Sequence, residues 1–180
     1  KVVYQYFISN HDSVIQNKLS KDKESLGLFY ITEKFDGVRC IAFIKNGSVQ
    51  LFNRSGREIT DAPEITEELL NVFASSEHVF DGELLISNSS GKAEDAFRET
   101  MTIVGSKDKK IGLTYHIFDE LTSVDRFLTQ DATRPYKTRR NVLESLSGTL
   151  NAQPHLSVVE YLYCGTHIEE AYRLRDTIVA

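Results

Sequence analysis

The sequence predicts an α+β domain whose sheet is largely antiparallel, and three observations support this prediction. Two β-rich runs, at 38–45 and 48–53, are joined by Asn46-Gly47. Asn-Gly between such runs indicates a two-residue hairpin turn, because both turn positions need a positive φ. Further β-rich runs alternate with helical patterns, which favours an α+β arrangement. The chain has 180 residues, 41% hydrophobic and 26% charged, as is typical of one compact domain with a core.

The remaining elements follow from the spacing of apolar residues along the chain. Further strands are expected at 28–32, 78–87, 113–119 and 156–163. Pro63 at a first helical turn predicts a short amphipathic helix that carries Ile65, Leu69, Val72 and Phe73. Other helices are expected from Asp12, through Ala93, Phe97 and Met101, from Lys137 to Leu146 after Pro135, and over Ile168, Tyr172 and Ile178.

Charge and hydropathy narrow the possible partners. The net charge of −5 argues against a domain that binds nucleic acid by bulk electrostatics, so any DNA contact must be local. No run approaches the roughly 18 apolar residues of a membrane helix, and the first residues do not form a signal peptide. We therefore expect no membrane partner and a cytoplasmic location, or a nuclear one in a eukaryote or virus. Cys40 and Cys164 have no metal-ligand spacing and are expected as reduced core residues.

The segment Glu33-Lys34-Phe35-Asp36-Gly37-Val38-Arg39 lies between two expected strands and could form a site. A lysine with apolar neighbours can be partly desolvated, which lowers the pKa of its amine and populates the neutral nucleophile. The glycine would let the backbone approach a ligand. The alternative is a surface turn with solvated charges and a glycine for positive φ. This segment alone leaves both interpretations open.

Three later segments resolve that ambiguity through a resemblance. Lys34-Phe-Asp36-Gly37-Val-Arg39 matches the K-x-D-G-x-R motif that ATP-dependent DNA ligases share with mRNA capping enzymes. The companion segments, in the family's order, are Arg54-Ser55-Gly56, Phe80-Asp81-Gly82-Glu83-Leu84 and Tyr115-His116-Ile117-Phe118-Asp119. Over residues 28–180 the chain thus resembles the adenylation domain of ATP-dependent DNA ligases, with small phage and viral ligases as the most similar kind. The resemblance implies an ATP-grasp-like nucleotidyltransferase fold.

The resemblance also implies a role for each motif residue. Lys34 would attack the α-phosphorus of ATP and form a covalent lysyl-AMP, with Asp36 as its catalytic companion. The nucleotide would be bound by Glu33 at the base edge, Arg39 and Glu83 at the ribose hydroxyls, Phe118 as a stacking face for adenine, and Arg54 at a phosphate. Each role suits the chemistry of its side chain. For the aromatic residue, a place in the core is the competing interpretation.

ATP and Mg²⁺ are the expected cofactors, because nucleotidyl transfer needs charge neutralised on the phosphates. Glu83 is the expected metal ligand, and Asp36 is a further candidate. The competing interpretation is that these carboxylates cap backbone donors in turns.

The implied reaction joins DNA. AMP would pass from Lys34 to the 5′-phosphate at a nick in double-stranded DNA, and the 3′-hydroxyl would then displace it, as in replication, repair and recombination. The domain would be a monomer. The alternatives are an mRNA capping guanylyltransferase, an RNA ligase, or a non-catalytic nucleotide-binding remnant. Glu33 before the lysine, Arg54-Ser55-Gly56 and the Asp-Gly-Glu-Leu segment favour the DNA ligase.

Two expectations concern the rest of the chain. No E-G-hydrophobic or K-x-K motif is found up to Ala180, so residues 1–180 are expected to be a partial adenylation domain without the C-terminal motifs and the OB-fold domain. By itself such a fragment would be weakly active or inactive. The basic run 134–140 is expected to be a solvated helix start rather than a DNA contact.

Overall fold

The computed structural model describes residues 29–87, 93–121, 123–130 and 134–179. The chain divides into two compact units, one of residues 1–34 with 160–180 and one of residues 35–159. The helix expected from Asp12 lies outside the described residues. Among those described, no helix is both long and apolar enough to cross a membrane. The expected domain organisation of the chain stays a prediction.

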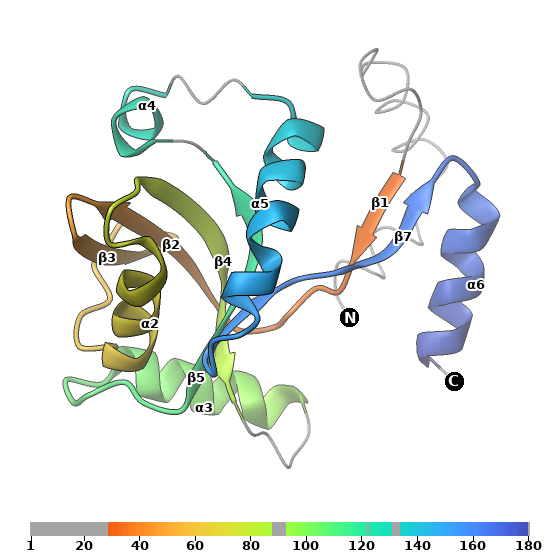
Figure 1. Cartoon of the computed structure of the whole chain (residues 1–180). Helices are drawn as coiled ribbons and strands as arrows, with labels where there is room; N and C mark the ends of the chain where they lie inside the picture. The colour runs from red at the N-terminus through yellow and green to blue at the C-terminus, as the bar shows by residue number, and fades with distance from the viewer. Residues whose placement is uncertain (1–28, 88–92, 122, 131–133, 180) are drawn as a thin grey trace. The chain divides into compact units, whose positions relative to one another are not determined.

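The larger unit is built on a five-stranded sheet (Figure 1). Its strands, in spatial order, are β3 (Ser48–Asn53), β2 (Val38–Lys45), β4 (His78–Ile86), β5 (Leu113–Glu120) and β6 (Leu156–Val158). All neighbours pair antiparallel except β5 and β6, which are parallel. The expected α+β class with largely antiparallel sheet is therefore confirmed.

The hairpin between β2 and β3 forms at the predicted turn. Asn46 and Gly47 have φ of 51° and 69°, the left-handed values that a two-residue turn needs. Lys45 pairs directly with Ser48 across this turn. The Asn-Gly dipeptide thus fixes the register of both strands.

Two predicted helices pack on this sheet. Helix α2 (Pro63–Phe73) buries Ile65, Leu69 and Phe73, whose ring lies 5.3 Å from that of Phe80 in β4. These three residues belong to the apolar face expected from the sequence. Helix α5 (Tyr136–Leu150) forms over the range expected after Pro135 and extends four residues further, and its Leu143 and Leu150 are fully buried.

Helix α3 (Ala93–Gly105) also forms where it was predicted, but it does not bury the residues that marked it. Phe97 and Met101 are 37% and 49% exposed, whereas Ala96 and Thr100 face the core. The hydroxyl of Thr100 donates to the carbonyl of Ala96 at 2.7 Å and accepts the amide of Ile86 in β4 at 3.1 Å. The helix approaches the sheet through small residues, which a search for large apolar residues overlooks.

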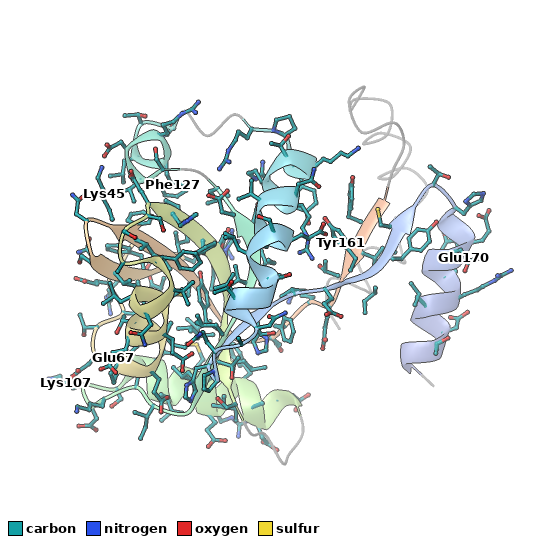
Figure 2. The ribbon with its side chains drawn as sticks, viewed as in Figure 1. Lys45, Glu67, Lys107, Phe127, Tyr161 and Glu170 are labelled. Atoms are coloured by element: carbon teal, nitrogen blue, oxygen red, sulfur yellow. The ribbon has the colours of Figure 1, made fainter. Side chains whose placement is uncertain are left out.

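A short helix, α4 (Val124–Leu128), was not predicted from the sequence. Its Phe127 ring lies 5.3 Å from Phe43 of β2, and its Asp125 pairs with Lys45 at 2.7 Å. Figure 2 shows Lys45 and Phe127 on the same side of the unit. At five residues the helix is too short to give a periodic pattern.

The smaller unit pairs β1 (Phe29–Thr32) with β7 (Tyr161–Gly165) in an antiparallel ladder, followed by α6 (Ile168–Val179). The prediction of one strand over 156–163 is wrong. The amide of Val159 makes a last hydrogen bond to the carbonyl of Ile117 at 2.8 Å, and the chain then leaves the five-stranded sheet. The strand-like run is therefore divided between two sheets.

The two cysteines differ in their surroundings. Both are free, as expected. Cys40 is fully buried in β2, but Cys164 in β7 is exposed, so the prediction of a core position is wrong for Cys164. Burial raises the pKa of the Cys40 thiol, which stays protonated as a core residue.

Gly82 in the middle of β4 provides a test of the sheet packing. A Cβ there would lie 2.4 Å from the backbone oxygen of His116 and 2.6 Å from the Tyr115 ring. We expect Gly82→Ala to lower the free energy of unfolding by about 1–3 kcal/mol or more, because the strands must move apart. Gly148→Ala in α5 meets no atom within 4 Å and should be neutral or stabilising by up to about 1 kcal/mol. Denaturant unfolding of both variants measures these changes. Equal free energies of unfolding for the two variants would contradict the packing of Tyr115 against Gly82.

Candidate functional site

The motif residues of the larger unit meet where β2 and β4 run side by side. Arg39 of β2 is the direct partner of Glu83 in β4, and Val38 is the partner of Leu84. Partners in an antiparallel pair project their side chains to the same face of the sheet. Two segments that are far apart in the sequence thus bring a guanidinium and a carboxylate together.

Arg39 is held in place by Asp81, two residues before Glu83. Its Nε donates to Asp81 Oδ1 at 2.6 Å, and its Nη2 donates to Oδ2. The Asp81 side chain is 7% exposed, whereas that of Arg39 is 46% exposed. The guanidinium carbon also lies 5.5 Å from the centre of the Phe118 ring of β5. One edge of the guanidinium is therefore fixed to the protein, while about half of the side chain remains accessible.

The pair has a clear electrostatic character. The hydrogen bonds that Arg39 donates to the Asp81 carboxylate raise the pKa of Arg39 above its usual range. Burial raises the pKa of the Asp81 carboxyl, although the Arg39 hydrogen bonds act in the opposite direction. A bidentate pair of this kind orients the planar guanidinium as well as neutralising the buried carboxylate.

Gly37 is the glycine of the first motif, and its contacts with β4 explain why no side chain fits there. Its amide donates to Glu83 Oε1 at 3.2 Å, and a Cβ at this position would lie 2.1 Å from the backbone oxygen of Leu84. The close approach that the structure shows is therefore to β4 itself. The sequence interpretation offered a ligand or a turn with positive φ as the reason for this glycine, and neither is the close approach to β4 that the structure shows.

Phe35 anchors the same segment at a second point. Its ring stacks on His116 of β5, with centroids 4.1 Å apart and planes inclined by 15°. Burial lowers the pKa of His116, so the ring stays neutral. Neither residue was singled out from the sequence. The alternation of inward and outward positions along the expected strand at 113–119 was the signal that could have placed His116 beside Phe118 on one face.

The first motif spans both units. Glu33 and Lys34 end the first segment of the smaller unit and are exposed, so the desolvation expected from apolar neighbours is not found at Lys34. Asp36 is exposed in the larger unit. Within that unit the structure brings together Arg39, Glu83 and Phe118.

Arg54 occupies a turn that directly follows β3, and its side chain is exposed. In the described ranges no hydrogen bond or ion pair involves its guanidinium. The turn is held by the side chain of Asn53, which the sequence interpretation did not consider.

The basic run 134–140 begins helix α5 as predicted, but its arginines are not solvated, and that part of the prediction is wrong. Arg139 pairs with Asp119 through two of its nitrogens at 2.9 Å, and Arg134 pairs with Glu120 at 2.7 Å. Arg140 is 4% exposed. Arg134 and Arg139 fasten the start of α5 to the end of β5, where the strand offers the adjacent carboxylates of Asp119 and Glu120. The sequence pattern did not connect these groups.

Few side chains in the described part of the chain are placed to bind a metal ion. In the part of the chain that the structure describes, no three His, Cys, Asp or Glu side chains are grouped so as to hold a metal. Mg²⁺ commonly takes one or two carboxylates and fills its remaining positions with phosphate oxygens and water. Glu83 and the exposed Asp36 fit such a partial set, in which a bound nucleotide would supply the other ligands.

Comparison with known proteins places this geometry in a family. The family model described as ATP dependent DNA ligase domain matches residues 13–178. The chain belongs to this ligase family. The resemblance of its motifs and the expected nucleotidyltransferase fold are thereby confirmed.

Individual relatives of the ligase domain agree with this assignment. The SPbeta prophage-derived DNA ligase-like protein LigB of Bacillus subtilis (strain 168) is 30% identical over 118 residues, which are 65% of this chain and 41% of that protein. The fold is similar to that of the ATP-dependent DNA ligase from bacteriophage T7 in complex with ATP, with a TM-score of 0.69, 14% identity, and coverage of 91% of this chain and 55% of that one. An RNA ligase of Naegleria gruberi matches with a TM-score of 0.50 at 16% identity, over 83% of this chain and 41% of that one.

These comparisons also limit what the fold decides. The ligase domain spans 41% of the curated relative and 55% of the phage ligase chain. DNA and RNA ligases share the fold, so the nucleic acid that is joined follows from the site and not from the fold.

The Arg39–Asp81 pair of the ligase domain predicts that loss of a buried carboxylate lowers the free energy of unfolding more than loss of a surface carboxylate. We expect Asp81→Asn to lower the free energy of unfolding by about 1.5–3 kcal/mol, because two hydrogen bonds to a charged group are weakened in a buried site. Asp125→Asn breaks a pair whose carboxylate is 76% exposed and should cost less than about 1 kcal/mol. Urea unfolding at neutral pH measures both, and a loss of equal size would contradict the structural role of Asp81.

His116 predicts a dependence of stability on pH. Because burial lowers its pKa below 6.5 in the folded ligase domain, the unfolded chain takes up this proton first as the solution is acidified. The stability that the neutral ring provides is thus present above pH 6.5 and lost as the pH falls below it. We expect unfolding free energies from about pH 8 to about pH 5 to fall less steeply in His116→Gln than in wild type. Parallel curves would show that His116 does not titrate in this way.

Proposed function

We propose that this ligase domain takes AMP from ATP on Lys34 and transfers it to the 5′-phosphate at a nick in double-stranded DNA. The observation that supports the proposal best is the convergence of Arg39, Glu83 and Phe118 at facing positions of neighbouring strands. In the sequence β2 begins four residues after Lys34, and β4 and β5 carry two of the three companion motifs. A guanidinium, a carboxylate and an aromatic face are the groups that a nucleoside requires.

The first step is a substitution at phosphorus. The neutral amine of Lys34 attacks the α-phosphorus of ATP, a P–N bond forms, and the P–O bond to the β-phosphate breaks, so pyrophosphate leaves and the amine loses a proton. In the second step a 5′-phosphate oxygen replaces the lysine nitrogen. The 3′-hydroxyl then displaces AMP and closes the nick. The activation of the ATP anhydride is thus kept in the P–N bond and then in the anhydride at the 5′-phosphate, and it is released when the nick closes.

Each site residue has a chemical task in the first step. Arg39 donates to a ribose hydroxyl and Glu83 accepts from one, since the two side chains share one face of the sheet. Phe118 offers a face to the adenine, which stacking stabilises by about 1–3 kcal/mol. Glu33 recognises the base edge, and Asp36 lies two residues from the nucleophile as its acidic companion.

Mg²⁺ would be held by Glu83, with Asp36 as a further carboxylate, and would neutralise charge on the phosphates of ATP as pyrophosphate departs. The acidic net charge of −5 makes local phosphate contacts necessary. Arg54, which is exposed at the end of β3, is suited to such a contact. We further propose that the domain acts as a monomer.

Intact mass spectrometry tests the first step. After a long incubation with ATP and Mg²⁺ we expect part of the chain to gain the mass of one AMP, in keeping with the weak activity expected of residues 1–180. Lys34→Ala should gain none because the attacking amine is missing. Lys45→Ala is the matched control, since this lysine of β2 pairs with Asp125 and Glu77 at the surface. It should be adenylated like the wild type.

The alternatives give distinct outcomes in the same assay. Adduct formation from GTP alone would identify a capping guanylyltransferase instead. Adduct formation from ATP followed by transfer only to RNA ends would identify an RNA ligase. Saturable ATP binding without any adduct would leave a nucleotide-binding remnant.

A further inference from the structure

The turn that follows β3 presents two arginines from a closed backbone loop. Residues 54–57 are all exposed, and they include Arg54 and Arg57. At the base of the loop, Leu51 is 1% and Ile59 is 6% exposed, and the amide of Ile59 donates to the carbonyl of Leu51 at 2.8 Å. An exposed, positively charged loop thus stands on a buried base.

Asn53 closes this loop with three of its own groups. Its backbone amide donates to the carbonyl of Arg57, and its backbone carbonyl accepts from the amide of Gly56, both at 2.9 Å. Its side-chain oxygen accepts from the amides of Ser55 and Arg57, each at 3.0 Å, and from the Ser55 hydroxyl at 2.8 Å. Every residue of the loop that bonds to Asn53 flanks or follows Arg54, so one side chain determines the path of the backbone around that arginine.

The hydrogen bonds of the loop occupy three of its backbone amides, and the arginine side chains are its charged donors. The amides of Ser55, Gly56 and Arg57 are already bonded within the loop. Within the described part of the chain, no hydrogen bond or ion pair involves the guanidinium of Arg54 or of Arg57. An anion that approaches this loop therefore meets guanidinium groups on a fixed backbone, and a guanidinium binds phosphate in a bidentate manner only when it is well oriented.

We propose that Asn53 is a positioning residue that orients Arg54 toward a phosphate of the substrate. The inference rests on the proposed function, because that function supplies the phosphate, either on ATP or at the 5′ side of the nick. Asn53 contacts no substrate and acts only through the loop. Gly56 assists with φ of 77°, a conformation that favours glycine.

An aspartate at position 53 would be equivalent to Asn53 in this role, whereas an alanine would not. The three bonds at the side chain all end on one oxygen, Oδ1, which accepts from each donor. A carboxylate offers the same acceptor, and both residues stabilise such local turns. Rescue by Asp therefore separates the acceptor function from a requirement for an amide.

The experiment compares Asn53→Ala, Asn53→Asp, Arg54→Ala and the double variant Asn53→Ala with Arg54→Ala. Ser55→Ala is the matched control. It removes the hydroxyl donor but keeps the hydrogen bonds from the amides of Ser55 and Arg57 to Asn53 Oδ1. One arm measures the rate of AMP loading against ATP concentration by intact mass. The other measures binding to nicked duplexes that carry either a 5′-phosphate or a 5′-hydroxyl.

We expect Arg54→Ala and Asn53→Ala to weaken the same arm, each on the order of 5- to 10-fold, since a misdirected guanidinium loses most of its phosphate contact. The arm that responds identifies the source of the phosphate. The double variant should lose no more than Arg54→Ala alone, because the two changes remove one interaction. Asn53→Asp and Ser55→Ala should stay within about twofold of wild type.

Other results would overturn the inference. Independent, multiplying losses in the double variant would show that Asn53 does not act through Arg54. A lowered melting temperature of Asn53→Ala with unchanged ATP and phosphate dependence would leave it a purely structural residue. If wild type takes up AMP and either result occurs, only the inference fails. If wild type takes up no AMP but Asn53 and Arg54 remain coupled in binding the 5′-phosphate, the proposed adenylation fails and the positioning role stands.

Discussion

The close approach of β2, β4 and β5 is the constraint on which the site depends. The Tyr115 ring of β5 is fully buried and lies against Gly82, and its hydroxyl contacts the carbonyl oxygens of Cys40 and Phe80 at 3.0 and 3.1 Å. A side chain at Gly82 would occupy the volume of this ring. Gly82 thus lets Tyr115 of β5 contact both β2 and β4 on the buried face of the sheet. Its neighbours Asp81 and Glu83 carry the polar functions.

The charges of the site are paired within the protein itself. Asp81 is bound to Arg39 and Asp119 to Arg139, so the buried or half-buried motif carboxylates already have partners. Glu83 accepts the amide of Gly37. This arrangement lowers the cost of binding, because a guanidinium that is already oriented loses little further freedom on contact with its ligand.

Sequence reasoning was most successful where a residue type determines its own conformation. The Asn46-Gly47 turn and the Pro63 helix start are of this kind, since positive φ and a missing amide are local properties. The motif order correctly predicted the fold and the juxtaposition of Arg39 with Glu83. What it missed depends on tertiary contact. The inward face of α3, the division of 156–163 between two sheets and the pairing of Arg139 with Asp119 follow from neighbours distant in the sequence.

The division of the chain into two units bears on the order in which it folds. The larger unit is one unbroken stretch, residues 35–159, whereas the smaller unit takes β1 from one flank and β7 from the other. During synthesis β1 therefore leaves the ribosome before its pairing strand β7 exists, and it remains unpaired until residues 35–159 have been made. Since long-range strand pairing must first overcome the entropy of loop closure, prior folding of residues 35–159 brings the two flanks within reach of each other. The segment that ends at Lys34 thus gains its pairing strand only after residues 35–159 have been synthesised.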